Sequence, residues 1–114
     1  MEQGDVYWVS MNPTRGYEIQ GKGKDRLRPC VILSPNVLNE TLKTLIIAPC
    51  TSQIKTPVPP YRVRLSSLEK EGLAVLDQIR SIDRERLARP MGKVTKKELS
   101  ACLKILQKIF QLRS

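Results

Sequence analysis

The apolar residues of this chain come in short runs separated by turn-forming residues, a pattern typical of a small β-rich domain. GDVYWVSMN (residues 4–12) is rich in β-forming residues and ends at Asn12-Pro13, so it predicts a strand of about six residues. RPCVILS (residues 28–34) and TLKTLIIAPCTS (residues 41–52) predict two further strands. PNVLNE, between these two, predicts a turn that can include one turn of helix.

Prolines restrict how two of these strands begin and end. Pro29 has no N–H to donate to a sheet, so it belongs at the first residue of its strand or on an edge. It also forces Arg28 into an extended conformation, which holds that cation at the mouth of the strand. Pro49 predicts a bulge or an edge near the end of the following strand.

The second half of the chain predicts more strands and one helix-like turn. YRVRLSS (residues 61–67) alternates apolar with basic residues, as a half-buried strand does. LAVLDQIRSID (residues 73–83) predicts one continuous strand, which breaks into a turn or short helix at DRERLAR (residues 83–89). MGKV (residues 91–94) predicts a last, short strand.

The C-terminal segment predicts an amphipathic helix. Thr95 and Glu98 have the spacing of a capping box. An apolar stripe at helical spacing follows them: Leu99, Cys102, Leu103, Leu106, Ile109 and Phe110. Several short strands with one terminal helix predict a mainly β fold, a small and strongly bent antiparallel barrel. A length of 114 residues suits a single domain spanning residues 1–114.

Two segments predict irregular loops. Residues 14–27, TRGYEIQGKGKDRL, contain three glycines and no apolar periodicity. A loop of that length in a small domain is usually functional or disordered. The second segment, QIKTPVPPY (residues 53–61), is stiffened by prolines.

Charge favours a polyanionic partner. The net charge is +9, with seven Lys/Arg against five Asp/Glu in residues 1–57 and thirteen against six in residues 58–114. Nucleic acid and an acidic protein both fit this excess, and charge alone does not separate them. A surface charged only for solubility is the remaining alternative.

Cysteine and histidine content argues against a metal site. Cys30, Cys50 and Cys102 are far apart, which fits neither a disulfide framework nor a zinc site, and the chain has no histidine. We therefore expect three buried thiols that pack as small apolar residues, with no metal and no cofactor. No run of about 20 apolar residues and no signal-peptide layout is present, so we expect a soluble, cytoplasmic protein.

Four stretches of the sequence together resemble a known family. GDVYWVSMNP, GYEIQGKGKDRLRPCVILS, IIAPCTSQ and GLAVLDQIRSID occur in that order. The chain resembles the MazF/PemK family of bacterial type II toxins over nearly its whole length. The resemblance implies an SH3-like β-barrel with a C-terminal helix that forms a homodimer. It also implies a metal-independent, sequence-specific endoribonuclease that cleaves single-stranded RNA such as mRNA, and that a cognate acidic antitoxin neutralises.

Matched position by position, the resemblance implies that Arg28 and Thr51 are catalytic. A guanidinium presents a planar fork of donors that matches the phosphoryl oxygens, where negative charge gathers during attack by the ribose 2′-hydroxyl. Thr51 can donate to a phosphoryl oxygen, or it can be a turn hydroxyl that bonds its own backbone. Glu18 is the candidate general base by chemical type, with a solvated loop carboxylate as the alternative.

The residues expected to contact RNA lie mainly in the two loops, at residues 14–27 and 52–60, which are expected to flank the substrate groove. They are Tyr17, Gln20, Arg26, Ser52, Gln53, Lys55, Asp77 and Gln78. Tyr17 can stack on an unpaired base. Asp77 and Gln78 fit a structural role equally well.

The chain departs from one branch of the family, in which a loop histidine and an arginine join the aspartate in catalysis. Tyr17 and Val75 occupy those positions here, so a mechanism based on Arg28 and Thr51 is favoured over one centred on Asp77. The competing hypotheses are a binding module without catalysis and a toxin of the same fold that acts on a protein such as gyrase. The pairing of Arg28 with Thr51 favours the ribonuclease, because the alternatives need neither residue.

Overall fold

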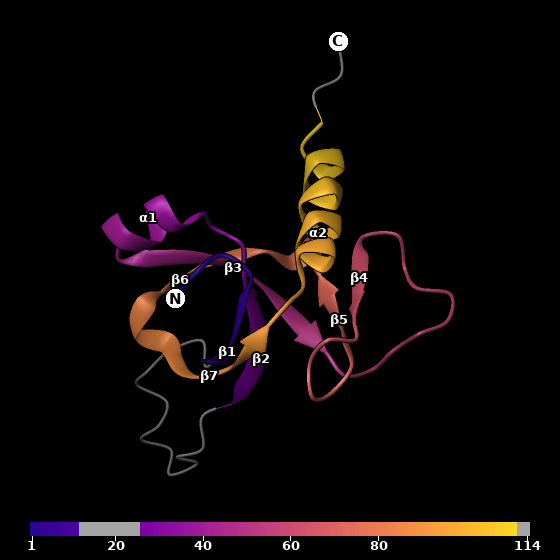
Figure 1. Cartoon of the computed structure of the whole chain (residues 1–114), viewed down its shortest axis with the longest axis horizontal. Coiled ribbons are helices and arrows are strands. Elements are labelled where there is room, and N and C mark those ends of the chain that lie inside the picture. The colour runs from indigo at the N-terminus through magenta and orange to yellow at the C-terminus, as the bar shows by residue number, and fades with distance from the viewer. Residues whose placement is uncertain (12–25, 112–114) are drawn as a thin grey trace.

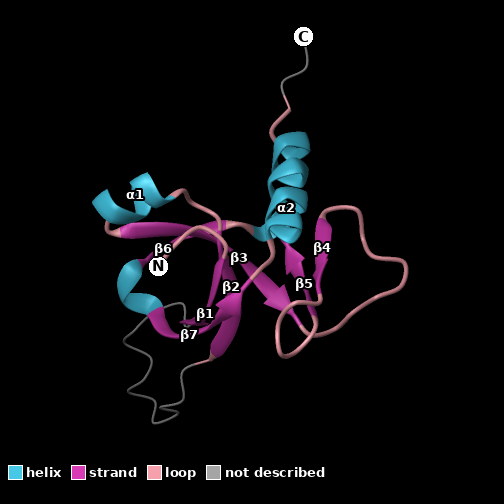
Figure 2. Ribbon diagram, viewed as in Figure 1, coloured by secondary structure: helices cyan, strands magenta, loops and turns pink. Residues whose placement is uncertain are grey.

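The computed structural model describes residues 1–11 and 26–111. In chain order the elements are β1 (Asp5–Ser10), β2 (Leu27–Ile32), α1 (Asn36–Thr41), β3 (Thr44–Thr51), β4 (Arg62–Leu65), β5 (Gly72–Val75), the 3-10 turn η2 (Leu76–Gln78), β6 (Arg80–Asp83), the 3-10 turn η3 (Arg84–Arg86), β7 (Leu87–Lys93) and α2 (Lys96–Ile109). Short strands dominate, and α2 stands above them (Figures 1 and 2). The predicted fold, mainly β with a C-terminal helix, is confirmed. No helix of the described residues is long and apolar enough to cross a membrane.

β3 organises the antiparallel sheet. The strand order is β4-β5-β3-β2-β1-β7, and β6 also pairs with β3. One edge of β3 pairs with β6 along Thr44–Ile47 and then with β5 at Cys50 and Thr51. Pro49 lies between these two pairings, where no ladder bond is required of it. The partner exchange curls the sheet into the barrel-like shape that the sequence predicts.

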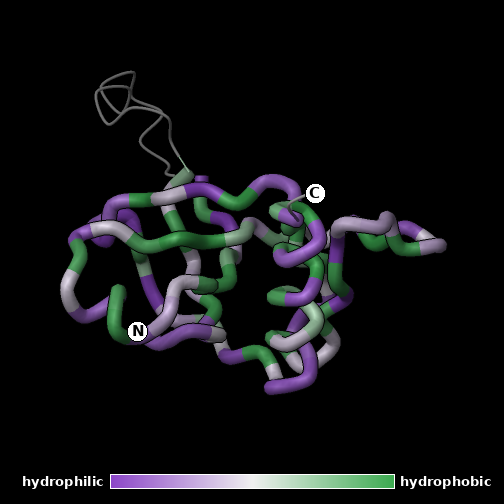
Figure 3. Tube along the Cα trace, turned by 90° about the horizontal axis from the view of Figure 1, so that it is seen from above, coloured by the Kyte–Doolittle hydropathy of each residue, from purple (hydrophilic) through white to green (hydrophobic). Residues whose placement is uncertain are grey.

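The curled sheet separates two apolar clusters because successive side chains of a strand point to opposite faces. Along β2, for example, Val31 belongs to one cluster, whereas Cys30 and Ile32 belong to the other. The first cluster lies beneath α2, and the second lies towards β6. Hydrophobic and hydrophilic stretches accordingly alternate along the chain trace (Figure 3). Burial on both faces explains why β2 and β3 are apolar at nearly every position.

The predicted capping box at the start of α2 is confirmed. Thr95 Oγ1 accepts from the Glu98 N–H at 3.0 Å, and Glu98 Oε1 accepts from the Thr95 N–H at 3.0 Å. The Glu98 carboxylate also accepts from the N–H groups of Ser66 and Ser67 and from the Ser67 hydroxyl. Burial alone would raise the pKa of Glu98, but these hydrogen bonds outweigh it and lower the pKa. Glu98 therefore ties the loop after β4 to the helix.

Only part of the apolar stripe of α2 faces the barrel. Cys102 is fully buried, and Leu99 and Leu106 pack against the first cluster. Leu103, Ile109 and Phe110 remain exposed, Phe110 by 69%. The predicted amphipathic helix is present, and the far end of its apolar stripe is exposed because the second half of α2 extends beyond the strands (Figure 1).

The strand predicted over residues 73–83 is also wrong as a single element. It divides into β5 and β6, with η2 between them, because its two halves pair with different parts of β3. β7 is longer than predicted and begins at Leu87. Pro29 is the third residue of β2, but pairing with β3 starts only at Cys30, so Pro29 lies on a local edge as predicted.

Candidate active site

Arg28 is anchored where β2 and β3 separate. It lies opposite Val9 of β1, and no strand among the described residues pairs with its other side, because β2 pairs with β3 only from Cys30 onward. Across this gap Arg28 Nε donates to the carbonyl oxygen of Cys50 at 3.2 Å. One of the five guanidinium N–H donors is thus used to fix the group, and the terminal nitrogens remain for a ligand. Within residues 1–11 and 26–111 they have no other hydrogen-bond partner.

Thr51 follows Cys50 at the end of β3. Its Oγ1 accepts from the Gln53 N–H at 3.2 Å, which is the turn hydrogen bond considered as an alternative role. Accepting this bond leaves the hydroxyl proton of Thr51 available to donate. The turn therefore orients the hydroxyl without consuming its donor.

Gly72 sets how closely β5 approaches this end of β3. A Cβ on Gly72 would lie 2.8 Å from the Thr51 carbonyl oxygen, which is too close for any side chain. Gly72 is buried and pairs with Leu65 of β4. Only glycine permits this packing behind Thr51.

These residues line a cavity of about 320 Å³. Its lining residues are Trp8, Leu27, Arg28, Pro29, Cys50, Thr51, Ser52, Leu65, Leu68, Lys70, Glu71, Gly72 and Met91. We call Arg28, Cys50 and Thr51 the arginine wall, and residues 66–71 between β4 and β5 the rim loop. Trp8 and Met91 are apolar lining residues outside both, and Leu68 is an apolar lining residue of the rim loop itself. The cavity thus combines a fixed cation, a hydroxyl, an aromatic surface and a charged rim.

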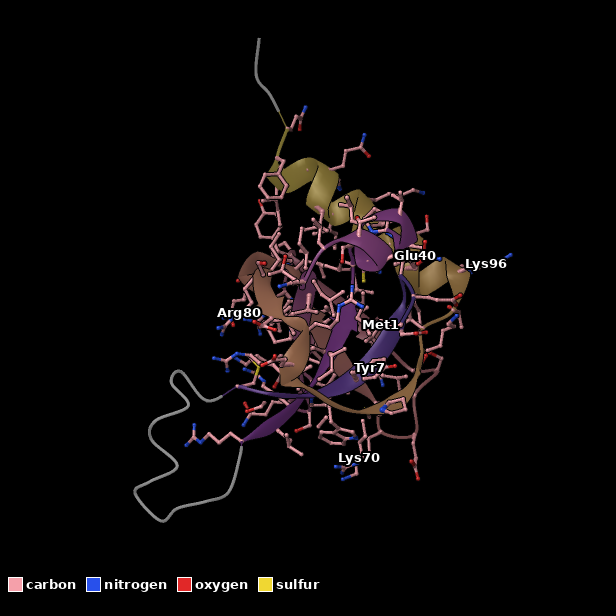
Figure 4. All side chains as sticks on the ribbon, turned by 90° about the vertical axis from the view of Figure 1, so that its left-hand side faces the viewer. Met1, Tyr7, Glu40, Lys70, Arg80 and Lys96 are labelled. Carbon is pink, nitrogen blue, oxygen red and sulfur yellow. The ribbon has the colours of Figure 1, made fainter. Side chains whose placement is uncertain are left out.

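The rim loop carries the other charges of the cavity. Arg64 Nη2 donates to Glu71 Oε1 at 2.7 Å, and both side chains are about half exposed. Lys70 lies at the lower edge of the folded body, below Tyr7 of β1 (Figure 4). The Arg89 guanidinium, which does not line the cavity, lies 5.4 Å from the centroid of the Trp8 ring, within cation–π range.

Of the residues predicted to act on RNA, the structure brings Arg28, Thr51 and Ser52 together in this cavity. Gln53 and Lys55 are exposed in the loop after β3, and Arg26 is exposed before β2; none of the three lines the cavity. Glu18, Tyr17 and Gln20 lie outside the described residues.

Asp77 and Gln78 lie in η2, away from the cavity lining. Asp77 Oδ1 lies 3.8 Å from Arg62 Nε, which joins η2 to the start of β4. This contact fits the structural role considered for Asp77, and its contact with RNA stays a prediction.

Sequence reasoning missed Trp8, Lys70, Glu71 and Met91 as cavity residues. The sequence pattern could have indicated Trp8, because it is two residues from the buried Val6 and therefore shares its face of β1. No sequence pattern indicates Lys70 and Glu71, because they reach the cavity only through the β4–β5 hairpin.

The three cysteines are buried and free, as predicted. Burial raises the pKa of Cys30 and of Cys50 to about 12 and that of Cys102 to about 11, so all three remain protonated thiols at neutral pH. Cys50 serves the site through its carbonyl oxygen rather than its sulfur. Across the described parts of the chain, no three His, Cys, Asp or Glu side chains are grouped to hold a metal ion.

The fold and the cavity together define a small protein with a barrel-like sheet whose cavity is lined by a fixed cation and a hydroxyl. A family model described as PemK-like, MazF-like toxin of type II toxin-antitoxin system matches residues 2–110, and the chain belongs to this family. This chain is 39% identical over 99 residues to the endoribonuclease toxin MazF of Escherichia coli K12, and the match covers 86% of this chain and 83% of that protein.

Solved structures agree in fold. MazF from Deinococcus radiodurans superposes with a TM-score of 0.78 at 25% identity, covering 98% of this chain and 97% of that one. A mycobacterial endoribonuclease in complex with its cognate antitoxin superposes with a TM-score of 0.78 at 18% identity, covering 100% of this chain and 98% of that one. The second likeness shows the fold alone.

Proposed function

We propose that the cavity beside the arginine wall is the site at which this endoribonuclease toxin cleaves single-stranded RNA, including mRNA, in a sequence-specific manner and without a metal ion. The observation that carries the proposal is the position of Arg28. Its guanidinium is fixed to the Cys50 carbonyl, one residue before Thr51, and both side chains line the same cavity. The E. coli relative, named an endoribonuclease toxin, supports the reaction class.

The reaction begins with attack of a ribose 2′-hydroxyl on the adjacent phosphorus. A bond forms between the 2′-oxygen and phosphorus, and the bond from phosphorus to the 5′-oxygen breaks. The products are a 2′,3′-cyclic phosphate and a 5′-hydroxyl. The 2′-hydroxyl proton goes to a general base, for which Glu18 is our candidate, and the departing 5′-oxygen takes up a proton.

Arg28 and Thr51 stabilise the charge that develops during this attack. The terminal N–H groups of Arg28 donate to the phosphoryl oxygens, and the Thr51 hydroxyl donates to one of them. Both donors are held in place before RNA arrives, by Cys50 and by Gln53 respectively. Proton donation by Arg28 is a secondary role, because a guanidinium holds its proton too tightly to act readily as an acid.

RNA bases bind around this centre in our proposal. The Trp8 ring offers a stacking surface inside the cavity, and Tyr17 offers a second one from the first loop. Gln20, Arg26, Ser52, Gln53 and Lys55 contact the strand on either side of the cut, and Asp77 and Gln78 contact it farther away.

We also propose that the toxin is a cytoplasmic homodimer neutralised by an acidic antitoxin. The exposed side of α2, with Leu103, Ile109 and Phe110, supports a subunit contact, and the net charge of +9 supports an acidic partner. The mycobacterial neighbour is described in complex with its cognate antitoxin. Sedimentation of the purified protein at micromolar concentration tests the dimer, and a strictly monomeric, active enzyme would refute it.

Cleavage in the presence of EDTA tests the proposed function. Purified protein should cut a mixed-sequence RNA with EDTA present and leave cyclic phosphate ends. Loss of cleavage on chelation, or products with a 5′-phosphate, would reject the mechanism. The hypothesis of a gyrase-directed toxin or a binding module is not favoured, because the relatives that match are named endoribonucleases.

A further inference from the structure

We infer that Glu71 reads the base edge of an RNA nucleotide in the cavity and selects an amino-bearing base, adenine, cytosine or guanine, over uracil. The inference rests on the proposed ribonuclease function and adds a residue that determines its sequence specificity. It starts from an anomaly of charge: a carboxylate lines the same cavity as Arg28, although RNA phosphates would be repelled by it.

The backbone fixes where Glu71 lies relative to the arginine wall. Gly72, the next residue, is buried against the carbonyl of Thr51, and its pairing with Leu65 holds the first residue of β5 in register. Glu71 immediately precedes β5 at this point and lines the cavity from the rim loop. Glu71 and Arg28, the cation that we propose binds phosphate, thus line the same cavity from two different elements.

Arg64 orients the carboxylate but leaves half of it available. Its Nη2 donates to Oε1 of Glu71 at 2.7 Å. The second oxygen, Oε2, makes no hydrogen bond to any residue in the described part of the chain. An ion pair this exposed contributes little to stability, so a folding role explains it poorly. A carboxylate held at one oxygen is, however, well suited to accept a hydrogen bond from a ligand at the other.

The chemistry of RNA decides what that oxygen accepts. A carboxylate only accepts hydrogen bonds, and the base groups that donate are the amino groups of adenine, cytosine and guanine and the ring N–H groups of guanine and uracil. Uracil flanks its single N–H with two carbonyl oxygens, which a carboxylate repels. Trp8 and Met91, which also line the cavity, provide an apolar surface for the base, and exclusion of water there strengthens the edge contact.

Cleavage of a randomised RNA by matched variants tests the inference. The cut ends are sequenced for the wild type, for Glu71→Ala and for Glu69→Ala, which removes an exposed rim-loop carboxylate outside the cavity lining. The wild type should prefer amino-bearing bases over uracil at one position beside the cut. Glu71→Ala should reduce that preference roughly tenfold, the usual scale for one lost base contact, and Glu69→Ala should leave it unchanged.

Two results would overturn the inference. An unchanged sequence profile for Glu71→Ala would leave Glu71 as a partner of Arg64 only. A uniform loss of rate on every sequence would make it a general base or a structural residue. Glu71→Gln keeps the volume and one carbonyl acceptor, so partial retention of the preference is expected and confirms that a hydrogen bond is read.

An assay of RNA binding tests this inference separately from the proposed ribonuclease function. RNA with 2′-O-methyl groups cannot be cleaved by 2′-hydroxyl attack, and fluorescence anisotropy measures its affinity. If the wild type binds with a base preference and Glu71→Ala does not, the inference is supported. This holds even if the wild type cleaves no RNA, although the absence of cleavage would reject the ribonuclease function. Cleavage by the wild type with no Glu71-dependent preference in either assay rejects the inference and leaves the ribonuclease standing.

Discussion

The arginine wall and the rim loop enclose the same cavity but are built differently. In the wall, Arg28 is fixed by a backbone carbonyl. Thr51 ends β3, which pairs with β2 along one edge and with β5 along the other. The rim loop is a hairpin connection whose charged side chains are exposed and whose attachment depends on side chains, chiefly Glu98. The difference suggests that the wall supplies constant chemistry, whereas the rim loop can vary and set which RNA is cut.

Substitution of Arg28 should have the largest effect. Arg28→Lys keeps the positive charge but loses both the bond from Nε to Cys50 and the planar fork, so cleavage should fall about 10²–10³-fold, as for loss of one transition-state donor. Initial rates on a fixed RNA measure this. Arg89→Lys is the matched control, because Arg89 is an arginine that contacts the Trp8 ring but does not line the cavity. Near-normal cleavage by Arg28→Lys would show that charge alone suffices.

Two substitutions of Thr51 distinguish a hydroxyl that donates a hydrogen bond to RNA from one that only forms the turn with Gln53. Thr51→Ser keeps the hydroxyl that accepts from Gln53, so cleavage should stay within about tenfold of wild type. Thr51→Val has nearly the same shape without a hydroxyl and should lose about 10²-fold. If Ser and Val variants lost equal activity while keeping the wild-type melting temperature, the methyl group and not the hydroxyl would be what matters.

Gly72 links the wall to the rim loop, and Gly72→Ala should damage both. The new Cβ would lie 2.8 Å from the Thr51 carbonyl, so β5 must move away from β3, at a cost of roughly 1–3 kcal/mol in unfolding free energy. Chemical denaturation measures this cost. Gly92→Ala is the control, because its Cβ would meet only the flexible end of Leu68, at 3.2 Å. A Gly72→Ala protein as stable as the control would show that β5 is free to shift.

Arg28 and Thr51 of the wall were candidates before the structure was known, whereas no residue of the rim loop was. Local features predict only where these two lie, at a proline-extended strand start and at the end of an apolar strand, and their catalytic roles are implied by the family resemblance and remain predictions. Glu71 and Lys70 reach the cavity only through the pairing of β4 with β5 and of β5 with β3, which depends on residues far apart in sequence. The same long-range pairing divides residues 73–83 into two strands, and no local pattern marks that division.

Acid should loosen the rim loop before it disturbs the wall. The pKa of Glu98 is lowered in the folded protein, so its stabilising contribution is complete above the ordinary value of 4.5 and is lost as the pH falls through the lower folded value. The hydrogen bond from Arg28 to the Cys50 carbonyl does not involve Glu98, so protonation of Glu98 should leave it in place. Protection of the Ser66 and Ser67 amides against hydrogen exchange, measured relative to their intrinsic exchange rates at each pH, should therefore fall in acid before protection of the Cys30 amide does. Simultaneous loss of protection would contradict separate attachment.

Glu98→Ala should reproduce this loosening at neutral pH. It removes the bonds to Ser66 and Ser67 together with the capping box, and it should cost about 1 kcal/mol or somewhat more. Thr95→Ala is the matched control, because it removes the cap but leaves the carboxylate on the rim loop. Equal exchange rates at Ser66 in the two variants would show that the helix cap, and not the carboxylate contact, holds the rim loop.

Substitution of Lys70 should have the smallest effect on RNA binding. It should also separate a contact with the RNA backbone from a contact with a base within the rim loop. Lys70 lines the cavity beside Glu71, but as an exposed ammonium it suits a phosphate contact that carries no base preference. Lys70→Gln should weaken RNA binding by a few-fold, equally for all sequences, and should reduce the slope of log affinity against log salt by about one. Binding to uncleavable RNA at several salt concentrations measures both quantities, with Lys97→Gln on α2, outside the cavity, as the control. Lys70→Gln could instead change the sequence preference and leave the salt dependence of the affinity unchanged. That result would mean that Lys70 contacts a base, as we infer for Glu71. Neither Lys70 nor Glu71 would then bind the RNA backbone.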